Sequence, residues 1–172
     1  MVESDGGFGE FVAARQVSLL RAAWLLTGNG VHAQDLVQHA LVKTLPRWRN
    51  LVDEGHPEAY VRKVMLNSYL SWWPRLGGRE EPRADLPEAA AEDPGLARAE
   101  LRAALVGALN RLPRRQRAVV VLRYYEDLSE AQTAAELGCS VGTVKSQASR
   151  GLAALREVMS IADESQGVRD GP

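Results

Sequence analysis

The chain has 172 residues, enough for one medium domain or two small ones, and its formal net charge of −1 argues against a protein that coats DNA through bulk positive charge. A single cysteine, Cys139, excludes an internal disulfide framework and favours a reducing compartment. The three histidines match no metal-ligand pattern, and there is neither a signal segment nor an apolar run of about 18 residues, so we predict a cytoplasmic protein without a metal or a membrane contact.

Charge is distributed unevenly along the chain. Residues 8–75 carry a net charge of +3 and residues 101–156 a net charge of +5, whereas residues 76–100 hold three basic side chains against seven acidic ones. Two mildly basic blocks on either side of an acidic segment suit a protein that contacts nucleic acid at two separated places. Chance unevenness would give the same totals.

Apolar residues recur at helical spacing in both blocks, and no stretch alternates as a strand would. Residues 76–91 are rich in Gly, Pro, Arg and Glu with few large apolar residues, which is typical of a flexible linker. We therefore predict an all-α protein with two small helical domains, at residues 8–75 and 94–160, joined by a linker at 76–93 and followed by a tail at 161–172.

The first block predicts three helices. The first covers residues 8–26 and stops at residues 27–30, where two glycines occur. The second covers about residues 31–50, with Pro46 bending its last turn. The third begins at Pro57, because proline is tolerated in the first turn of a helix.

The second of these helices has two distinct faces. Its core face consists of Leu36, Val37, Ala40, Leu41, Thr44 and Trp48. The opposite face mixes apolar and polar residues, namely Asp35, Gln38, Val42, Leu45 and Arg49. Such a mixture favours a docking surface, although a helix buried on two sides of a small bundle would give the same pattern.

The third helix combines cations and aromatic rings. Arg62, Lys63 and Asn67 lie away from its core face, and Trp72 and Trp73 close it. Cations for phosphates and rings for unstacked bases are what single-strand capture requires. A role in the core is the better explanation of the two tryptophans, because each ring buries a large area.

The second block begins with a helix that ends near Asn110, followed by one that starts at Pro113. Arg114, Arg115 and Arg117 lie in the first turn of the latter. Cations there oppose the helix macrodipole unless an anion compensates them. DNA phosphate would serve, and a solvated cluster is the alternative.

The strongest pattern is a helix-turn-helix over residues 128–150. Ser129 and Gln132 form a capping box, Gly138 stops the first helix, and Ser140 can cap the second, which runs toward Met159 before residues 157–172 fray into an acidic tail. The second helix has an apolar face made of Val144, Ala148, Gly151, Leu152 and Leu155. Its other side presents Lys145, Ser146, Ser149 and Arg150.

A helix with an apolar back and a front of short polar and basic residues suits the major groove of DNA. An ordinary amphipathic hairpin with a solvated front is the alternative. The agreement of the cap, the glycine and the core spacing favours DNA recognition.

Three stretches resemble a known family. Gly142-Thr-Val-Lys-Ser146 with Ser149-Arg150 resembles the recognition helix of region 4 in sigma factors of bacterial RNA polymerase, above all the extracytoplasmic-function (ECF) group and its actinobacterial sigma-E-like members. Residues 112–128 resemble the start of that domain. Asp35-Leu-Val-Gln38 resembles the Asp-x-Val-Gln stretch of region 2.

The resemblance assigns roles to particular residues. Asp35, Leu36 and Gln38 would contact the clamp coiled coil in the largest subunit of core RNA polymerase. Promoter DNA would be bound at the −35 element by Lys145, Ser146, Ser149 and Arg150. At the −10 element it would be bound by Arg62, Lys63 and Asn67, with bases captured in a loop at residues 51–56. Family members also bind anti-sigma factors, so the resemblance implies such a partner.

The predicted function is therefore that of a sigma factor. No phosphate-binding loop, nucleophile–base pair or carboxylate dyad supports an enzyme, and no cofactor is predicted. The alternatives are a stand-alone helix-turn-helix regulator that binds operator DNA without polymerase, and a helical adaptor that binds only protein.

Overall fold

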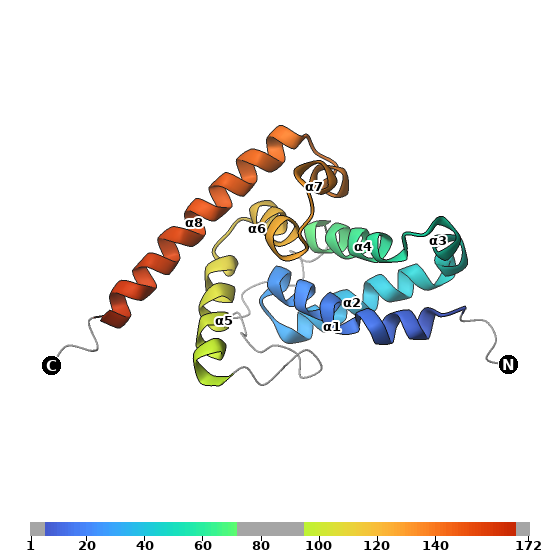
Figure 1. The fold of residues 1–172 in the computed structure, drawn as a ribbon, viewed down its shortest axis with the longest axis horizontal. Coiled ribbons are helices and arrows are strands. Elements are labelled where there is room, and N and C mark those ends of the chain that lie inside the picture. Colours follow the sequence, from blue (N-terminus) through green and yellow to red (C-terminus); the bar gives the residue numbers. More distant parts are fainter. Residues whose placement is uncertain (1–5, 72–94, 168–172) are drawn as a thin grey trace. The chain divides into compact units, whose positions relative to one another are not determined.

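The computed structural model describes residues 6–71 and 95–167. Within these residues every regular element is helical and no strand occurs, which confirms the predicted all-α class (Figure 1). They form two compact units, one containing α1 to α4 and the other α5 to α8. The predicted linker, Trp72 and Trp73 lie outside the described residues. No helix in the described part of the chain has the length and apolar character needed to cross a membrane.

The first unit begins with two helices that pack along each other. Helix α1 (Phe8–Thr27) ends at Gly28, whose φ of 68° lets its N–H bond to the carbonyl of Trp24 at 2.7 Å. Helix α2 (Gly30–Thr44) starts at Asn29, whose side-chain oxygen accepts from the N–H groups of Val31 and His32. The core they share with α4 contains Trp24, Leu36, Leu41, Val61, Met65 and Leu66.

Pro46 interrupts the second predicted helix, as expected, but the chain then returns to a helix. A 3₁₀ turn, η1 (Leu45–Arg47), is followed by α3 (Trp48–Glu54), which ends at Gly55 with a φ of 80°. The prediction of a loop over residues 51–56 was therefore wrong. Only Gly55 and His56 separate α3 from α4 (Pro57–Ser71), because burial of Trp48 and Leu51 stabilises a short helix there.

Trp48 fixes α3 to the start of α1. Its ring lies 5.1 Å from that of Phe8 and 4.9 Å from that of Phe11, measured between centroids. Its indole N–H donates to the carbonyl of Gly6 at 2.9 Å. An aromatic cluster with a satisfied indole N–H is a strong packing element, so the first turn of α1 helps to hold α3 in place.

The second unit contains α5 (Gly95–Asn110), α6 (Arg114–Val120), a π-helical turn η4 (Val121–Tyr125), α7 (Glu130–Leu137) and α8 (Val141–Gly167). Helix α8 packs against α5, α6 and α7. It continues to Gly167, whereas the sequence predicted fraying from residue 157. The interval from 152 to 166 contains neither proline nor glycine, so nothing in it breaks the helix.

The contact between α6 and α8 depends on a glycine. A Cβ atom on Gly151 would lie 2.7 Å from Cγ2 of Val120, which is closer than side-chain atoms pack. Gly151 therefore permits an approach of the two helices that no other residue would allow without a shift.

Candidate nucleic-acid interface

The helix-turn-helix of the second unit is set by local hydrogen bonds. The Ser129 hydroxyl accepts from the N–H of Gln132 at 3.1 Å, and the Gln132 side chain accepts from the N–H of Ser129 at 2.8 Å. Gly138 ends α7 with a φ of 63°. The Ser140 hydroxyl accepts from the N–H of Thr143 at 3.1 Å and so caps α8. The capping residues predicted from the sequence are confirmed.

The two faces of α8 are divided as the sequence predicted over its first half. Val144, Ala148, Gly151 and Leu155 are buried, and Leu152 is half-buried. Packing against α7 also buries Ala134 and Leu137. The four candidate −35 residues share the exposed side of α8, namely Lys145, Ser146, Ser149 and Arg150. The structure thus brings these four together on one accessible surface.

The arginines near the start of α6 have partners inside the protein. Arg115 donates to the carbonyl of Leu137 at 3.3 Å, where it complements the negative end of the α7 dipole. Arg117 is buried and donates to the side chain of Asn110. Arg117 is therefore not the phosphate-binding or solvated cation that the sequence suggested, whereas Arg115 remains exposed. Arg123, farther along, donates to the carbonyl of Leu128. These cations hold the unit together.

The outer face of α2 and η1 is exposed. Asp35 and Gln38 are accessible, and beside them the side chains of Val42 and Leu45 are 67% and 46% exposed. This excludes a helix buried on two sides and leaves a mixed apolar and polar surface. Leu36 differs, because it is 0% exposed. It belongs to the core face, so it supports the surface from beneath and is not available as a contact residue.

The pKa of one side chain on α2, His39, is shifted. Burial, together with the positive charge of Lys43, lowers the pKa of His39, so that imidazole is neutral at physiological pH.

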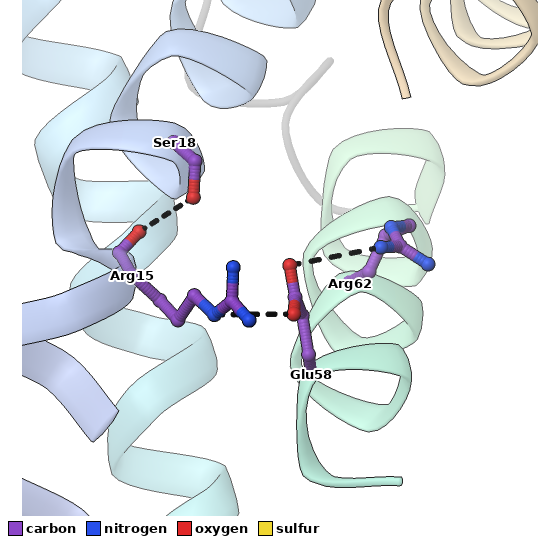
Figure 2. Close-up of polar contacts among 4 residues, drawn as sticks. All are labelled: Arg15, Ser18, Glu58 and Arg62. Carbon is purple, nitrogen blue, oxygen red and sulfur yellow. Dashed lines mark hydrogen bonds and ion pairs between the residues drawn. The ribbon is translucent and has the colours of Figure 1, made fainter. Parts of the chain in front are cut away.

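The predicted −10 residues on α4 are divided between two sides of the helix. Arg62 lies beside Glu58, one turn earlier on α4: its guanidinium is 4.0 Å from that carboxylate, and its side chain is only 17% exposed (Figure 2). Glu58 is also 3.3 Å from Arg15 of α1, as the dashed lines in Figure 2 show. Lys63 and Asn67 are exposed, and helical spacing places them on the side away from Glu58.

Two residues near these candidates were missed from the sequence. Tyr60 is half-buried and precedes Lys63 and Asn67 by three and seven residues, so it lies on their side of α4. That spacing was a readable signal. Arg15 is far away in the sequence, and no local pattern indicates its pairing with Glu58.

No metal site is evident in the described part of the chain, where no three His, Cys, Asp or Glu side chains gather closely enough to hold an ion. Cys139 is half-buried in the turn between α7 and α8. The residues that the structure exposes together are suited to binding macromolecules through charge, hydrogen bonds and apolar contact.

Comparison with known proteins agrees with this arrangement. The family described as Sigma-70, region 4 matches residues 102–155, which extend from α5 into α8. The chain is 45% identical over 156 residues to an RNA polymerase sigma-E factor of Streptomyces avermitilis, covering 91% of this chain and 87% of that protein. It is 32% identical to the ECF RNA polymerase sigma factor EcfG of Rhodopseudomonas palustris, over 81% of this chain and 77% of that one.

A solved structure is similar over nearly the same length. It is the sigma factor RpoE in complex with the anti-sigma factor NepR from Bartonella quintana, with a TM-score of 0.72 and 25% identity. The similarity covers 90% of this chain and 97% of that one.

Proposed function

The chain belongs to the ECF sigma factors of bacterial RNA polymerase, and from this premise we propose that it binds the core enzyme and directs transcription initiation at promoters with matching −10 and −35 elements. The observation that supports this proposal most strongly is the capped helix-turn-helix. It lies within the residues that match region 4, and its second helix exposes a polar and basic side. In this proposal residues 8–75 act as region 2 and residues 94–160 as region 4, with a linker at 76–93; the predicted tail at 161–172 begins within α8, which continues to Gly167.

Region 4 reads the −35 element with the exposed side of α8. Lys145 and Arg150 reach phosphates or guanine edges, and the short side chains of Ser146 and Ser149 allow the helix to approach the base pairs closely. The buried residues of the opposite side hold α8 against α6 and α7. Binding therefore requires no rearrangement of the helix backbone.

Region 2 contacts the clamp coiled coil of the largest polymerase subunit with the outer face of α2 and η1. Asp35 and Gln38 supply polar contacts, while Val42 and Leu45 supply apolar area that is exposed in the free chain. Apolar area with a few polar groups is typical of a specific protein interface. Leu36 has a supporting role in this proposal.

The −10 element is bound by the outward side of α4. Lys63 attracts the phosphates, Asn67 offers both donors and an acceptor to a base edge, and Tyr60 provides a ring on which an unstacked base can lie. Arg62 contributes less to this contact than the sequence suggested, because it is mostly covered and lies near Glu58.

Sigma factors are initiation factors, and we propose no enzymatic activity and no cofactor for this chain. Its partners are core polymerase and promoter DNA, so its place of work is the cytoplasm. An anti-sigma factor is a further proposed partner, since the structurally similar RpoE was solved in complex with one. Such an inhibitor would have to cover the α2 surface or the exposed side of α8.

A gel-shift experiment with and without core polymerase tests the proposal. The duplex is one that the chain and core together enrich from a random-sequence pool. A specific shift that requires both components supports the sigma factor. A shift by the chain alone would indicate the stand-alone regulator, and no contribution to the shift under any condition would indicate the protein-binding adaptor.

Arg150→Ala separates DNA recognition from polymerase binding. We expect it to weaken −35-dependent transcription about tenfold or more, because a base or phosphate contact contributes about 1–3 kcal/mol, while core binding is unchanged. Arg156→Ala is the matched control, since Arg156 is an exposed arginine about 9 Å farther along α8 and outside the four residues proposed to contact the −35 element. Equal losses in transcription and core binding by Arg150→Ala would contradict its assigned role.

A further inference from the structure

An acidic side chain lies at the proposed DNA surface of the second unit. Glu130 is the first residue of α7, and its carboxylate lies 3.7 Å from the ammonium of Lys145 on α8. Both side chains are accessible, with exposed fractions of 37% and 64%. The pair thus joins the two helices of the helix-turn-helix at the edge that faces solvent.

Both ends of this ion pair start from a fixed backbone. The reciprocal bonds between Ser129 and Gln132 define where α7 begins, and Glu130 follows the cap directly. Ser140 defines the start of α8 five residues before Lys145. The carboxylate and the ammonium are therefore neighbours because of the fold, and only their side-chain torsions are adjustable.

A carboxylate at this place opposes DNA binding. The screening length is about 8 Å at physiological salt, so a charge 3.7 Å from Lys145 acts on any phosphate that Lys145 contacts. Of the two cations of α8 proposed to contact DNA, Lys145 and Arg150, one is partly neutralised in the free chain. Phosphate attraction is the sequence-independent part of DNA affinity, so it is this part that the pair reduces.

We infer that Glu130 is an intramolecular competitor of DNA phosphate: it holds Lys145 until promoter DNA displaces it, and so limits the sequence-independent affinity of region 4. This inference rests on the proposed function. The consequence is that DNA binding depends more strongly on the base contacts of α8 and on attachment to polymerase.

Glu130→Gln tests the inference, because glutamine keeps the size and polarity of the side chain and removes its charge. Holoenzyme made with this variant should bind the enriched duplex about two- to fivefold more tightly, as expected for the loss of an exposed ion pair. It should gain equally on a duplex whose −35 segment is shuffled. The slope of log affinity against log salt should steepen by up to about 0.9, the value of one added phosphate contact.

The matched control is Glu157→Gln. Glu157 is an exposed glutamate on the same helix, twelve residues after Lys145 and so about 18 Å farther along the axis. It should leave affinity and salt slope unchanged. Hydrogen exchange of the α7 amides checks that Glu130→Gln has not altered the start of that helix.

A double-mutant cycle with Lys145→Gln decides whether Glu130 acts through Lys145. In the Lys145→Gln background, Glu130→Gln should change the affinity for DNA less than about 1.5-fold, because the cation that Glu130 and phosphate compete for has been removed. If Glu130→Gln raises the affinity as much in that background as in the unmodified chain, Glu130 repels DNA directly, and the inference is overturned. A loss confined to the enriched duplex would make Glu130 a base-reading residue and also overturns it. If unmodified holoenzyme binds no better than core alone, the proposed function itself fails.

Discussion

The close approach of α6 and α8 gives a prediction whose sign can be worked out from the structure. Gly151→Ala places a Cβ atom 2.7 Å from Cγ2 of Val120, whereas ordinary contacts begin at 3.4 Å. Val120 is buried and its χ1 is restricted within a helix, so it cannot turn away. The helices must separate, at a cost of about 1–3 kcal/mol. The higher helix propensity of alanine offsets about 0.5–1 kcal/mol of this cost, so we expect a net loss of about 0–2.5 kcal/mol.

Gly107→Ala is the matched control within the same unit. A Cβ atom on Gly107 of α5 meets nothing within 4 Å, so this substitution should stabilise the helix by about 0.5–1 kcal/mol. The assay is hydrogen exchange of peptides from α5 to α8, with peptides from α1 to α4 as the internal reference. In a Val120→Ala background the clash is absent, so Gly151→Ala should then stabilise the unit instead of destabilising it. If Gly151→Ala raises protection as Gly107→Ala does, the close contact between α6 and α8 is refuted.

Three further variants test the helix-turn-helix and the docking surface. Ser129→Ala removes the acceptor for the Gln132 N–H and should cost about 1 kcal/mol, measured as faster hydrogen exchange at the start of α7; unchanged rates would contradict the cap. Replacing Asp35 and Gln38 together by arginine should weaken binding to core polymerase about tenfold with unaltered thermal stability, measured by surface plasmon resonance and circular dichroism. Leu36→Ala should instead lower stability by about 2–5 kcal/mol, and a stable Leu36→Ala variant that fails to bind core would restore Leu36 as a contact residue.

The helix-turn-helix was predictable from the sequence because its determinants are local. The capping box joins residues three apart, Gly138 acts through its own φ, and Ser140 caps its own helix. Each is a bond or a torsion that depends on a few neighbouring residues. The exposed side of α8 followed from the same helix period.

The features that the sequence did not predict depend on contacts between distant residues. Arg115 donates to the carbonyl of Leu137, 22 residues away in the sequence. Glu58 pairs with Arg15 of α1, which precedes it by 43 residues. Helix α3 exists because Trp48 has the rings of Phe8 and Phe11 to pack against. None of these partners can be read from spacing along the chain.

The candidate docking surface was predictable only in part. Its residues were identified from helical period, but whether they are covered or exposed depends on the packing of α2, and Val42 and Leu45 proved to be exposed. Leu36 was a candidate contact only through the family resemblance; the helical period had placed it on the core face, where the structure buries it. Periodicity assigns a residue to a face, and the neighbouring helices determine what that face does.

Run-off transcription with purified core polymerase tests the central claim most directly. The template carries a promoter that the chain and core enrich together, and product is measured with the chain present, with the chain omitted, and with the Arg150→Ala variant. We predict full-length product that depends on the chain and falls about tenfold or more with the variant. Equal product when the chain is omitted would contradict the assignment of a promoter-directing role to this protein.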